Sequence, residues 1–266
     1  MPYSKTAVVT GASSGIGAVY ADRLAARGYD LVLVARRGDR LAALSEKLTL
    51  QYGIKAQSLV ADLGNGADVA KVEERLISDP SIQLLVNNAG FARLRPLADS
   101  SLDDSLSQIN VNITALTRLA QAALKGFRAR KEGILINIAS VLAVHSLPVS
   151  SVYSGTKAYV LAFSRGLQEE FSGTGIKVQV VMPAATDTEI WTEGVSGIPL
   201  SALSAERVMT AQHCVDAALA GLDADEQVTW PSVADAGLWH AFDTARSTLF
   251  DATQVGAPAP RYNLTK

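Results

Sequence analysis

Short apolar runs alternate along the chain with longer segments in which apolar residues recur at helical spacing. The first run, residues 6–10, ends at Gly11, and residues 16–28 follow with alanine and leucine on one helical face. This order predicts a strand, a tight turn and a helix. The same unit repeats along most of the chain, so we expect strands and helices in regular alternation.

Some of the apolar runs, such as residues 31–35, contain no polar residue at all. A strand of this kind is buried on both faces, as in a parallel sheet that helices cover on each side. The expected strands are residues 6–10, 31–35, 56–61, 84–86, 133–138, 177–182 and 228–230. The expected helices are residues 16–28, 40–52, 65–77, 102–108, 111–129, 151–171, 205–222 and 233–249.

This alternation predicts an α/β fold, namely a Rossmann-like doubly wound parallel β-sheet of about seven strands with helices on both faces. No internal repeat or linker interrupts the pattern, and a chain of 266 residues fits one domain of this class, so we expect a single domain over residues 1–266. Residues 184–203 are less regular and contain Pro199 and several glycines. We expect this segment to be a mobile flap over a substrate.

Composition narrows the functional classes. Hydrophobic residues make up 48% of the chain and charged residues 19%, which supports a sizeable core. The formal net charge of −2 offers no electrostatic reason to expect nucleic acid or an anionic membrane as a partner. No apolar run approaches the roughly 18 residues that span a bilayer, and no signal-peptide pattern opens the chain. We therefore expect a cytoplasmic protein.

The residues that commonly bind metals are few and scattered. Cys214 is the only cysteine, so it forms no intramolecular disulfide, and its neighbour His213 would point in another direction on a helix. His145 and His240 stand far from it in the sequence. We expect no metal site.

A glycine-rich turn follows the first expected strand. Gly11, Gly15 and Gly17 are spaced G-x-x-x-G-x-G, which differs from the more familiar G-x-G-x-x-G pattern. Glycines at such a turn let a pyrophosphate approach the backbone, and the following helix offers free N–H groups and the positive end of its dipole. The position of the turn between the first strand and the first helix favours phosphate binding over an ordinary loop.

The end of the second expected strand indicates which nicotinamide cofactor would bind. An acidic residue there accepts hydrogen bonds from a ribose 2′-OH, whereas arginine accommodates a 2′-phosphate. The chain has Arg36 and Arg37 at this point, and no acid. Arg37 and Arg40 could simply line a solvated helix start, but Arg36 is expected to bind the 2′-phosphate of NADP(H).

Tyr153 and Lys157 stand four residues apart in the expected helix 151–171, so their side chains leave the same face. A positive charge about 4 Å from the phenol would lower the pKa of Tyr153 by roughly 3 units at an effective dielectric of about 20. Desolvation of the phenol would oppose this shift. The pair could therefore form a working acid. Taken alone, it could equally be a core ring beside a lysine that extends to the surface.

Together these patterns resemble the single-domain branch of the short-chain dehydrogenase/reductase family. The resemblance rests on Thr10-Gly11-x3-Gly15-x-Gly17, Asn87-Asn88-Ala89-Gly90, Ser140 and Tyr153-x3-Lys157, which occur in the family's order and spacing. It covers nearly the whole chain. Each motif is modest alone, but the four together are highly specific.

The resemblance implies a role for each catalytic residue. Tyr153 would donate the proton in carbonyl reduction and accept it in alcohol oxidation, while Lys157 would lower the pKa of Tyr153 and hold the nicotinamide ribose. Ser140 would hydrogen-bond the substrate oxygen. Asn112 would support a proton-relay water at Lys157, with Asn110 as the rival for that role.

The resemblance also implies the residues that bind the cofactor NADP(H). They are Gly11, Ser13, Ser14, Gly15, Ile16, Gly17, Arg36, Asp62, Leu63, Asn88, Ala89, Gly90, Tyr153, Lys157, Pro183, Thr186 and Thr188. One position departs from the family, because Ala184 stands where Pro183 is usually followed by glycine. Alanine does not adopt every backbone shape open to glycine, so the loop near the nicotinamide is expected to differ slightly.

The expected function is an NADP(H)-dependent oxidoreductase that transfers a hydride between the nicotinamide and a carbonyl or secondary alcohol. The expected partner is a small apolar substrate, because Val141, Leu142, Val144, Leu147, Val149, Ile190 and Trp191 suggest an apolar pocket, although several could be core or subunit contacts. By resemblance, helices 112–127 and 153–171 would pair in a homodimer or homotetramer.

Three other functions stay open at this point. A reductase of 3-oxoacyl groups on a carrier protein would share all these motifs. A non-catalytic dinucleotide sensor would share the fold, although it would have no need for Asn112, Ser140, Tyr153 and Lys157 together. A serine hydrolase is disfavoured, because Ser140 lacks the G-x-S-x-G elbow.

Overall fold

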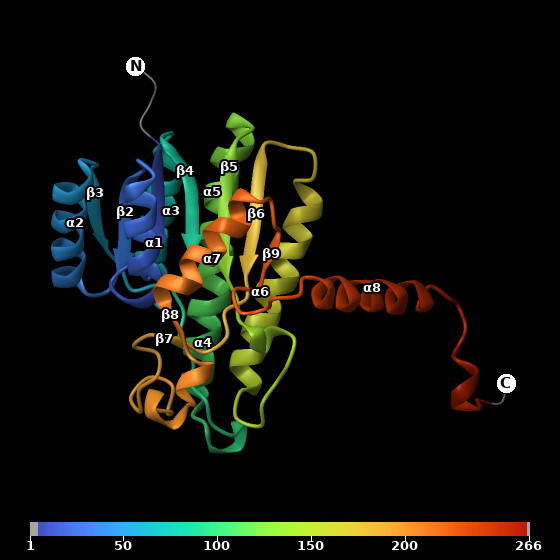
Figure 1. Ribbon diagram of the computed structural model, residues 1–266. Helices are drawn as coiled ribbons and strands as arrows, with labels where there is room; N and C mark the ends of the chain where they lie inside the picture. The colour runs from blue at the N-terminus through green and yellow to red at the C-terminus, as the bar shows by residue number, and fades with distance from the viewer. Residues whose placement is uncertain (1–4, 265–266) are drawn as a thin grey trace. The chain divides into compact units, whose positions relative to one another are not determined.

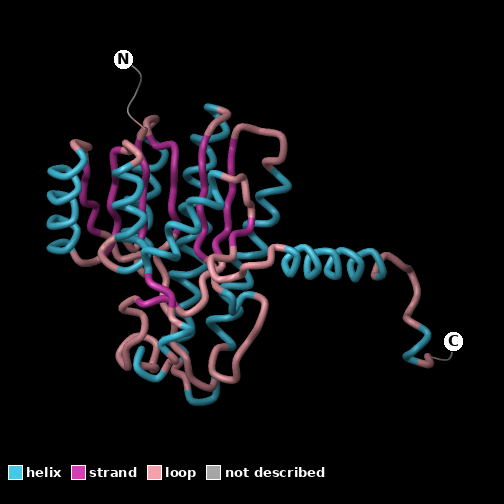
Figure 2. Tube along the Cα trace, in the orientation of Figure 1, coloured by secondary structure: helices cyan, strands magenta, loops and turns pink. Residues whose placement is uncertain are grey.

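The computed structural model describes residues 5–264, and its centre is a parallel sheet of seven strands (Figures 1 and 2). The strand order is β3-β2-β1-β4-β5-β6-β9. These strands are β1 (Thr6–Thr10), β2 (Asp30–Ala35), β3 (Ala56–Val60), β4 (Ile82–Asn87), β5 (Gly133–Ile138), β6 (Ile176–Val181) and β9 (Val228–Thr229). The order reverses at β1, which pairs with both β2 and β4. Ligands of such sheets bind beyond the carboxyl ends of the strands at this reversal.

Helices cover both faces of the sheet, as the expected doubly wound fold requires (Figure 1). Alternate residues of β1 enter two separate apolar clusters, Ala7 and Val9 in one and Val8 in the other. The first cluster contains residues of α1 (Gly15–Ala26), α2 (Gly38–Tyr52) and α7 (Ala211–Asp223). The second contains residues of α3 (Gly66–Ser78), α5 (Leu116–Arg130) and α6 (Ser151–Glu170). The predicted Rossmann-like fold is confirmed.

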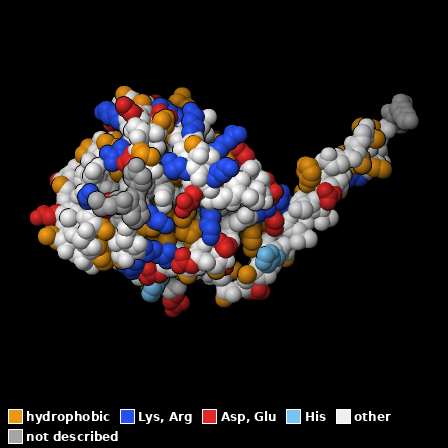
Figure 3. All heavy atoms as spheres, turned by 90° about the horizontal axis from the view of Figure 1, so that it is seen from above, with side chains coloured by type: hydrophobic (Ala, Val, Ile, Leu, Met, Phe, Trp, Pro, Cys, Tyr) orange, Lys and Arg blue, Asp and Glu red, His pale blue; other side chains and the backbone are white. Residues whose placement is uncertain are grey.

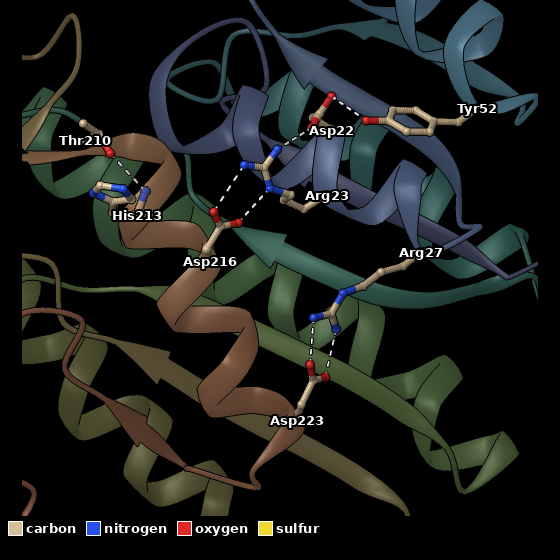
Figure 4. A network of polar contacts seen from close by, with 8 residues as sticks. All are labelled: Asp22, Arg23, Arg27, Tyr52, Thr210, His213, Asp216 and Asp223. Atoms are coloured by element: carbon tan, nitrogen blue, oxygen red, sulfur yellow. Dashed lines mark hydrogen bonds and ion pairs between the residues drawn. The ribbon is translucent and has the colours of Figure 1, made fainter.

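Ion pairs tie α7 to α1 across the surface of the first cluster (Figure 4). Arg23 donates through Nε and Nη2 to the two oxygens of Asp216, at 2.7 and 3.3 Å. Arg27 forms a similar two-bond contact with Asp223, at 2.9 and 2.8 Å. The guanidinium of Arg23 holds the pKa of the Asp216 carboxyl below its usual range. Paired hydrogen bonds of this kind fix orientation as well as adding attraction.

The segment that follows the flap differs from the expected pattern. The helix expected from residue 205 begins at Ala211 instead. The residues before it form a 3₁₀ turn (Ala205–Arg207) and then β8 (Met209–Thr210), which pairs in parallel with β7 (Thr186–Asp187). Thr210 ends this short ladder and also caps α7, because its hydroxyl accepts a hydrogen bond from the backbone N–H of His213 at 3.1 Å.

The expected helix 111–129 also differs at its start. A π-helix (Asn110–Ala115) joins α4 (Leu102–Ile109) to α5, so the three elements run on without a break. A π-helix inserts an extra residue per turn and commonly marks a functional site. Asn112, the predicted catalytic asparagine, lies in this π-helix.

The chain divides into two compact units, with the boundary between Ser232 and Val233. The first unit contains the sheet. The second contains α8 (Gly237–Ala252), which has no buried residue, and a 3₁₀ turn (Pro260–Tyr262). In α8 the rings of Trp239 and Phe242 stack at 5.5 Å between centroids. The expectation of one domain over residues 1–266 stays a prediction.

On the face of the molecule seen in Figure 3, lysine and arginine side chains are interspersed with aspartate and glutamate. This mixture agrees with the small net charge of −2. Within residues 5–264, no helix combines the length and apolar character needed to cross a membrane. The cytoplasmic location and the homodimer or homotetramer stay predictions.

Candidate functional site

The glycine turn between β1 and α1 has the backbone shape that its residues allow. Gly11 and Gly15 have φ angles of +67° and +53°, which are left-handed and favour glycine. A Cβ on Gly17 would lie 2.3 Å from the carbonyl oxygen of Gly11 and 2.6 Å from Nδ2 of Asn88. Ser14 occupies the N-cap of α1, but its side chain does not cap the helix. The first N–H groups of α1 therefore remain available to an anion.

Residues at the end of β4 hold this turn in place. Asn88 donates through Nδ2 to the carbonyl oxygen of Thr10 at 2.9 Å. The Thr10 hydroxyl accepts from the backbone N–H groups of Asn88 and Ala89, both at 3.0 Å, and donates to the Val86 carbonyl at 3.1 Å. The predicted segment Asn88, Ala89 and Gly90 thus lies directly beside the glycine turn.

Tyr153 and Lys157 extend from α6 toward the carboxyl end of the sheet. The Lys157 ammonium lies 5.7 Å from the centroid of the Tyr153 ring and donates to the Ile138 carbonyl at 2.8 Å. Lys157 is buried, with 5% of its surface exposed, and burial lowers its pKa to about 8. Burial raises the pKa of Tyr153 to about 12, while a hydrogen bond with Ser140 acts in the opposite direction.

The sign of the Tyr153 shift differs from the expected one. The resemblance implied that Lys157 lowers the pKa of Tyr153, whereas burial of the phenol dominates here and raises it. The physical reason is that low-dielectric surroundings disfavour the charged form of both groups. Each of them is therefore moved toward neutrality.

Ser140 follows β5 and meets Tyr153. It is buried, with 7% of its surface exposed, and stands at the N-cap of a 3₁₀ turn (Val141–Ala143). Its hydroxyl accepts a hydrogen bond from the Leu142 N–H at 3.1 Å, and Ser140 and Tyr153 line one cavity. The two hydroxyl groups that were expected to contact one substrate oxygen are thus brought together.

Asn112 lies in the π-helix and is buried, whereas its rival Asn110 is exposed. The Asn112 side chain accepts from the N–H of Phe91 at 3.1 Å and donates to its carbonyl at 2.9 Å. It also donates to the Thr156 hydroxyl at 3.1 Å. A Cβ on Gly90 would lie 3.0 Å from Oδ1 of Asn112 and 3.6 Å from Nζ of Lys157. Asn112 therefore reaches the neighbourhood of Lys157.

A sequence model described as short chain dehydrogenase matches residues 5–197. The chain belongs to the short-chain dehydrogenase family. It is an oxidoreductase of this family, and the segments that contain the predicted catalytic residues all lie within the matched residues.

Two solved structures of dehydrogenases are similar over nearly the whole chain. One is a short-chain dehydrogenase from Sphingobium yanoikuyae in complex with NADPH, with 44% identity, 97% of this chain and 100% of that chain covered, and a TM-score of 0.92. Another is the bulky-bulky ketone specific alcohol dehydrogenase from Comamonas testosteroni, with 38% identity, 98% and 99% coverage and a TM-score of 0.88.

A curated relative is the very-long-chain 3-oxoacyl-CoA reductase of Anas platyrhynchos. It is 36% identical over 188 residues, which are 69% of this chain and 60% of that protein. The chain thus spans less than two thirds of the length of this relative.

The site of this short-chain dehydrogenase opens into a cavity of about 560 Å³ at the carboxyl end of the sheet. Most of the predicted cofactor and catalytic residues line it; Gly17 packs beneath the turn, and Asn112 lies behind Gly90. The lining residues among them are Gly11, Ser13, Ser14, Gly15, Ile16, Arg36, Asp62, Leu63, Asn88, Ala89, Gly90, Ser140, Tyr153, Lys157, Pro183, Thr186 and Thr188. In the described part of the chain, no group of three or more histidine, cysteine or acidic residues is placed to hold a metal ion.

The other end of the cavity is apolar. Of the apolar residues expected there, Val141, Leu142, Leu147, Ile190 and Trp191 line it, whereas Val144 and Val149 do not. Phe91, Ala92, Leu94, Val195 and Leu203 add to this wall. The departure at Ala184 costs no backbone strain, because Ala184 is not among the residues with positive φ.

The flap closes one side of the cavity through contacts with the loop after β4. Leu94 donates its backbone N–H to the Ser196 carbonyl at 2.8 Å, and the Arg93 guanidinium bonds the carbonyls of Gly194 and Val195. Within the flap, Trp191 donates through Nε1 to the Thr186 carbonyl at 2.9 Å. The flap is therefore held against the loop after β4, next to the apolar wall.

Two site residues were not predicted from the sequence. Arg37 donates to the hydroxyl groups of Ser13 and Ser14 on the glycine turn, at 2.8 to 3.2 Å. The only feature of the sequence that could have indicated a role for Arg37 is its position next to Arg36. Glu189, which contacts Arg37 from the flap, lies far away in the sequence, and no motif marks it.

Proposed function

We propose that this protein is an NADP(H)-dependent oxidoreductase that moves a hydride between the nicotinamide and a carbonyl or secondary alcohol carbon. The observation that carries the proposal is that Ser140, Tyr153 and Lys157 line the same cavity as the glycine turn. Two hydroxyl groups that face one cavity can bind one substrate oxygen and exchange a proton with it.

The residues around the glycine turn fit a dinucleotide. Neighbouring atoms pack so closely against Gly15 and Gly17 that a Cβ would not fit at either position. The start of α1, which no side chain caps, offers N–H groups to a phosphate. Arg36 and Arg37 at the end of β2 are suited to a 2′-phosphate. The NADPH complex of the Sphingobium relative supports this choice. When bound, the nicotinamide supplies or accepts the hydride.

Tyr153 would transfer the proton. In reduction, the Tyr153 hydroxyl gives its proton to the substrate oxygen while the carbonyl carbon gains the hydride; in oxidation, the phenolate takes the hydroxyl proton and the carbon loses the hydride. Ser140 donates a hydrogen bond to the same oxygen. A charged Lys157 near the phenol favours the phenolate form, and its fixed position behind Gly90 keeps this charge near the site.

The apolar end of the cavity favours substrates with bulky hydrocarbon groups beside the carbonyl. Leu142, Leu147, Ile190 and Trp191 form part of this wall. The Comamonas relative is described as specific for ketones with two bulky groups, which agrees with the proposal.

A second candidate is a reductase of 3-oxoacyl thioesters, favoured by the same apolar wall and by the name of the Anas relative. The two candidates differ in what lies beyond the carbonyl, since a thioester carries a large polar carrier. Rates with free bulky ketones and with 3-oxoacyl thioesters, each followed by NADPH absorbance, distinguish them. A preference of the enzyme for the thioester would select the second candidate.

The proposed chemistry is tested by replacing Tyr153 with phenylalanine. Tyr153→Phe removes the proton donor and leaves the ring, so turnover should fall by about 100-fold or more while NADPH affinity stays nearly unchanged. The measurement is NADPH oxidation with a panel of ketones and aldehydes, together with a fluorescence titration of NADPH.

The matched control is Tyr159→Phe on the same helix. The Tyr159 hydroxyl contacts Thr117 at 2.8 Å, and Tyr159 does not line the cavity, so its loss should leave turnover close to that of the parent. Near-normal turnover in Tyr153→Phe would refute the proposed role.

A further inference from the structure

Glu189 joins the flap to the start of α2 through both of its carboxylate oxygens. Oε2 lies 2.6 Å from Nη1 of Arg37, and Oε1 lies 2.5 Å from Nη1 of Arg40. Through these contacts the segment after β7 is attached to the start of α2, next to the glycine turn. Because Arg37 and Arg40 hold the carboxylate, the pKa of Glu189 is lowered to about 2, and Glu189 stays charged at any working pH.

Arg37 stands between Glu189 and the glycine turn. Its Nε and Nη2 atoms donate to the Ser13 hydroxyl, and Nη2 also donates to the Ser14 hydroxyl. Ser13, Ser14, Arg37 and Glu189 all line the same cavity. The only nitrogen of Arg37 that is not turned to the serines, Nη1, is therefore used by a flap carboxylate.

A carboxylate and a phosphate bind to the same hydrogen-bond donors of an arginine. Both bind the guanidinium through paired oxygens, and each therefore excludes the other from the same donors. A 2′-phosphate carries a charge of about −1.5 to −2 at neutral pH, against −1 for Glu189. If the proposed function holds, Glu189 and the 2′-phosphate compete for Arg37 at the start of α2.

We propose, resting on the proposed function, that Glu189 is an intramolecular competitor of the 2′-phosphate for Arg37. A nucleotide with a 2′-phosphate displaces the Glu189 carboxylate and so releases the flap from α2. A nucleotide without it leaves the flap attached. Glu189 thereby determines how strongly the protein prefers NADP(H) over NAD(H), and it links that choice to the position of the substrate flap.

The test compares two nucleotides that differ only in the 2′-phosphate and cannot react. Titration calorimetry with 2′,5′-ADP and with 5′-AMP measures each Kd in the parent and in Glu189→Gln. The substitution keeps the shape of the side chain and removes its charge. It should tighten 2′,5′-ADP by about threefold to tenfold, the effect of a partly exposed ion pair, and leave the Kd of 5′-AMP unchanged.

The control is Glu193→Gln, which removes the charge of another acidic side chain of the flap. Glu193 is exposed and does not line the cavity, so the Kd of both nucleotides should match the parent. Equal tightening by both variants would overturn the proposal, because it would reflect net charge alone. A weaker 2′,5′-ADP complex in Glu189→Gln would also overturn it, because Glu189 would then be positioning Arg37.

Flap release has its own readout in the emission of Trp191, which lies in the flap and lines the cavity. In the parent, 2′,5′-ADP should change this emission and 5′-AMP should not, with Trp191→Phe identifying the signal. An unchanged Trp191 signal at saturating 2′,5′-ADP would refute flap release. A parent protein that binds neither NADPH nor 2′,5′-ADP would instead refute the proposed function, so the two failures are distinguishable.

Discussion

Burial moves Tyr153 and Lys157 toward their neutral forms, although they ionise in opposite senses. The pKa of the phenol rises to about 12 and that of the ammonium falls to about 8. Lys157 is fixed by its bond to the Ile138 carbonyl, so its charge acts from a defined position. We therefore expect pH to affect the proposed proton transfer through the protonation state of Lys157.

Lys157 should lose its proton near pH 8 in the nucleotide-free protein. The folded pKa lies below the usual value of 10.5, so the folded protein binds this proton less tightly than the unfolded chain does. Folding stability from this group is therefore lowest below pH 8 and rises toward pH 10.5. Lysine side-chain NMR, with Lys157→Met to identify the resonance, gives the midpoint. A resonance that stays protonated at pH 10 would contradict the predicted dominance of burial.

At the residue scale, the sequence is informative where a motif is local. The spacing of Tyr153 and Lys157 in one helix, and the glycines of one turn, follow from short-range geometry. The preference for Asn112 over Asn110 comes from the resemblance to the family, whereas the π-helix that contains both residues is indicated by no local pattern. The position of Arg37 depends on Glu189, which is 152 residues away in the sequence.

Among the elements, α7 is positioned by capping at its start and by ion pairs along its length. The cap comes from Thr210, and the pairs come from Asp216 and Asp223 (Figure 4). The helical pattern of residues 205–222 alone extends six residues too early, because it does not register the pairing of β8 with β7. Tertiary pairing overrides propensity at this boundary.

Asp216→Asn should lower the free energy of unfolding by about 0.5–1 kcal/mol, a value limited by solvent screening of a half-exposed pair. The pKa of Asp216 is lowered in the folded state, so this contribution is complete at neutral pH. It is lost only as pH falls below the ordinary aspartate range of about 4, through the folded pKa. Urea unfolding at pH 7 and at pH 3 measures it.

A double-mutant cycle with Arg23→Gln isolates the pair from the contact of Arg23 with Asp22. An additive cycle at pH 7 would show that the pair does not stabilise the helix contact.

At the scale of the whole molecule, the two apolar clusters lie entirely within the first unit. The sequence could predict this sheet, since most of its strands are short, largely apolar runs that alternate with helical patterns. It could not predict that α8 would have no buried residue, because its apolar residues occur at the same helical spacing as those of the core helices.

A chain that ends at Ser232 should therefore fold. Its thermal midpoint should lie within about 4 °C of the full chain, because no residue of α8 is buried and little core is lost. Circular dichroism on heating measures both. A chain that ends at Asp225 is the contrasting control, since it also lacks β9, whose Thr229 bonds Gln179 and Met182. Loss of the cooperative transition in the longer truncated chain would contradict the prediction.

The short ladder between β7 and β8 has a consequence for how the enzyme can diversify. Because the two short strands pair, the two ends of segment 188–208 lie close together. The entropy cost of closing a loop grows only slowly with its length. Insertions or replacements in this segment should therefore change the stability of the fold little. The wall of the cavity can thus be rebuilt for a new substrate while the sheet, the glycine turn and the Tyr153 helix keep their positions.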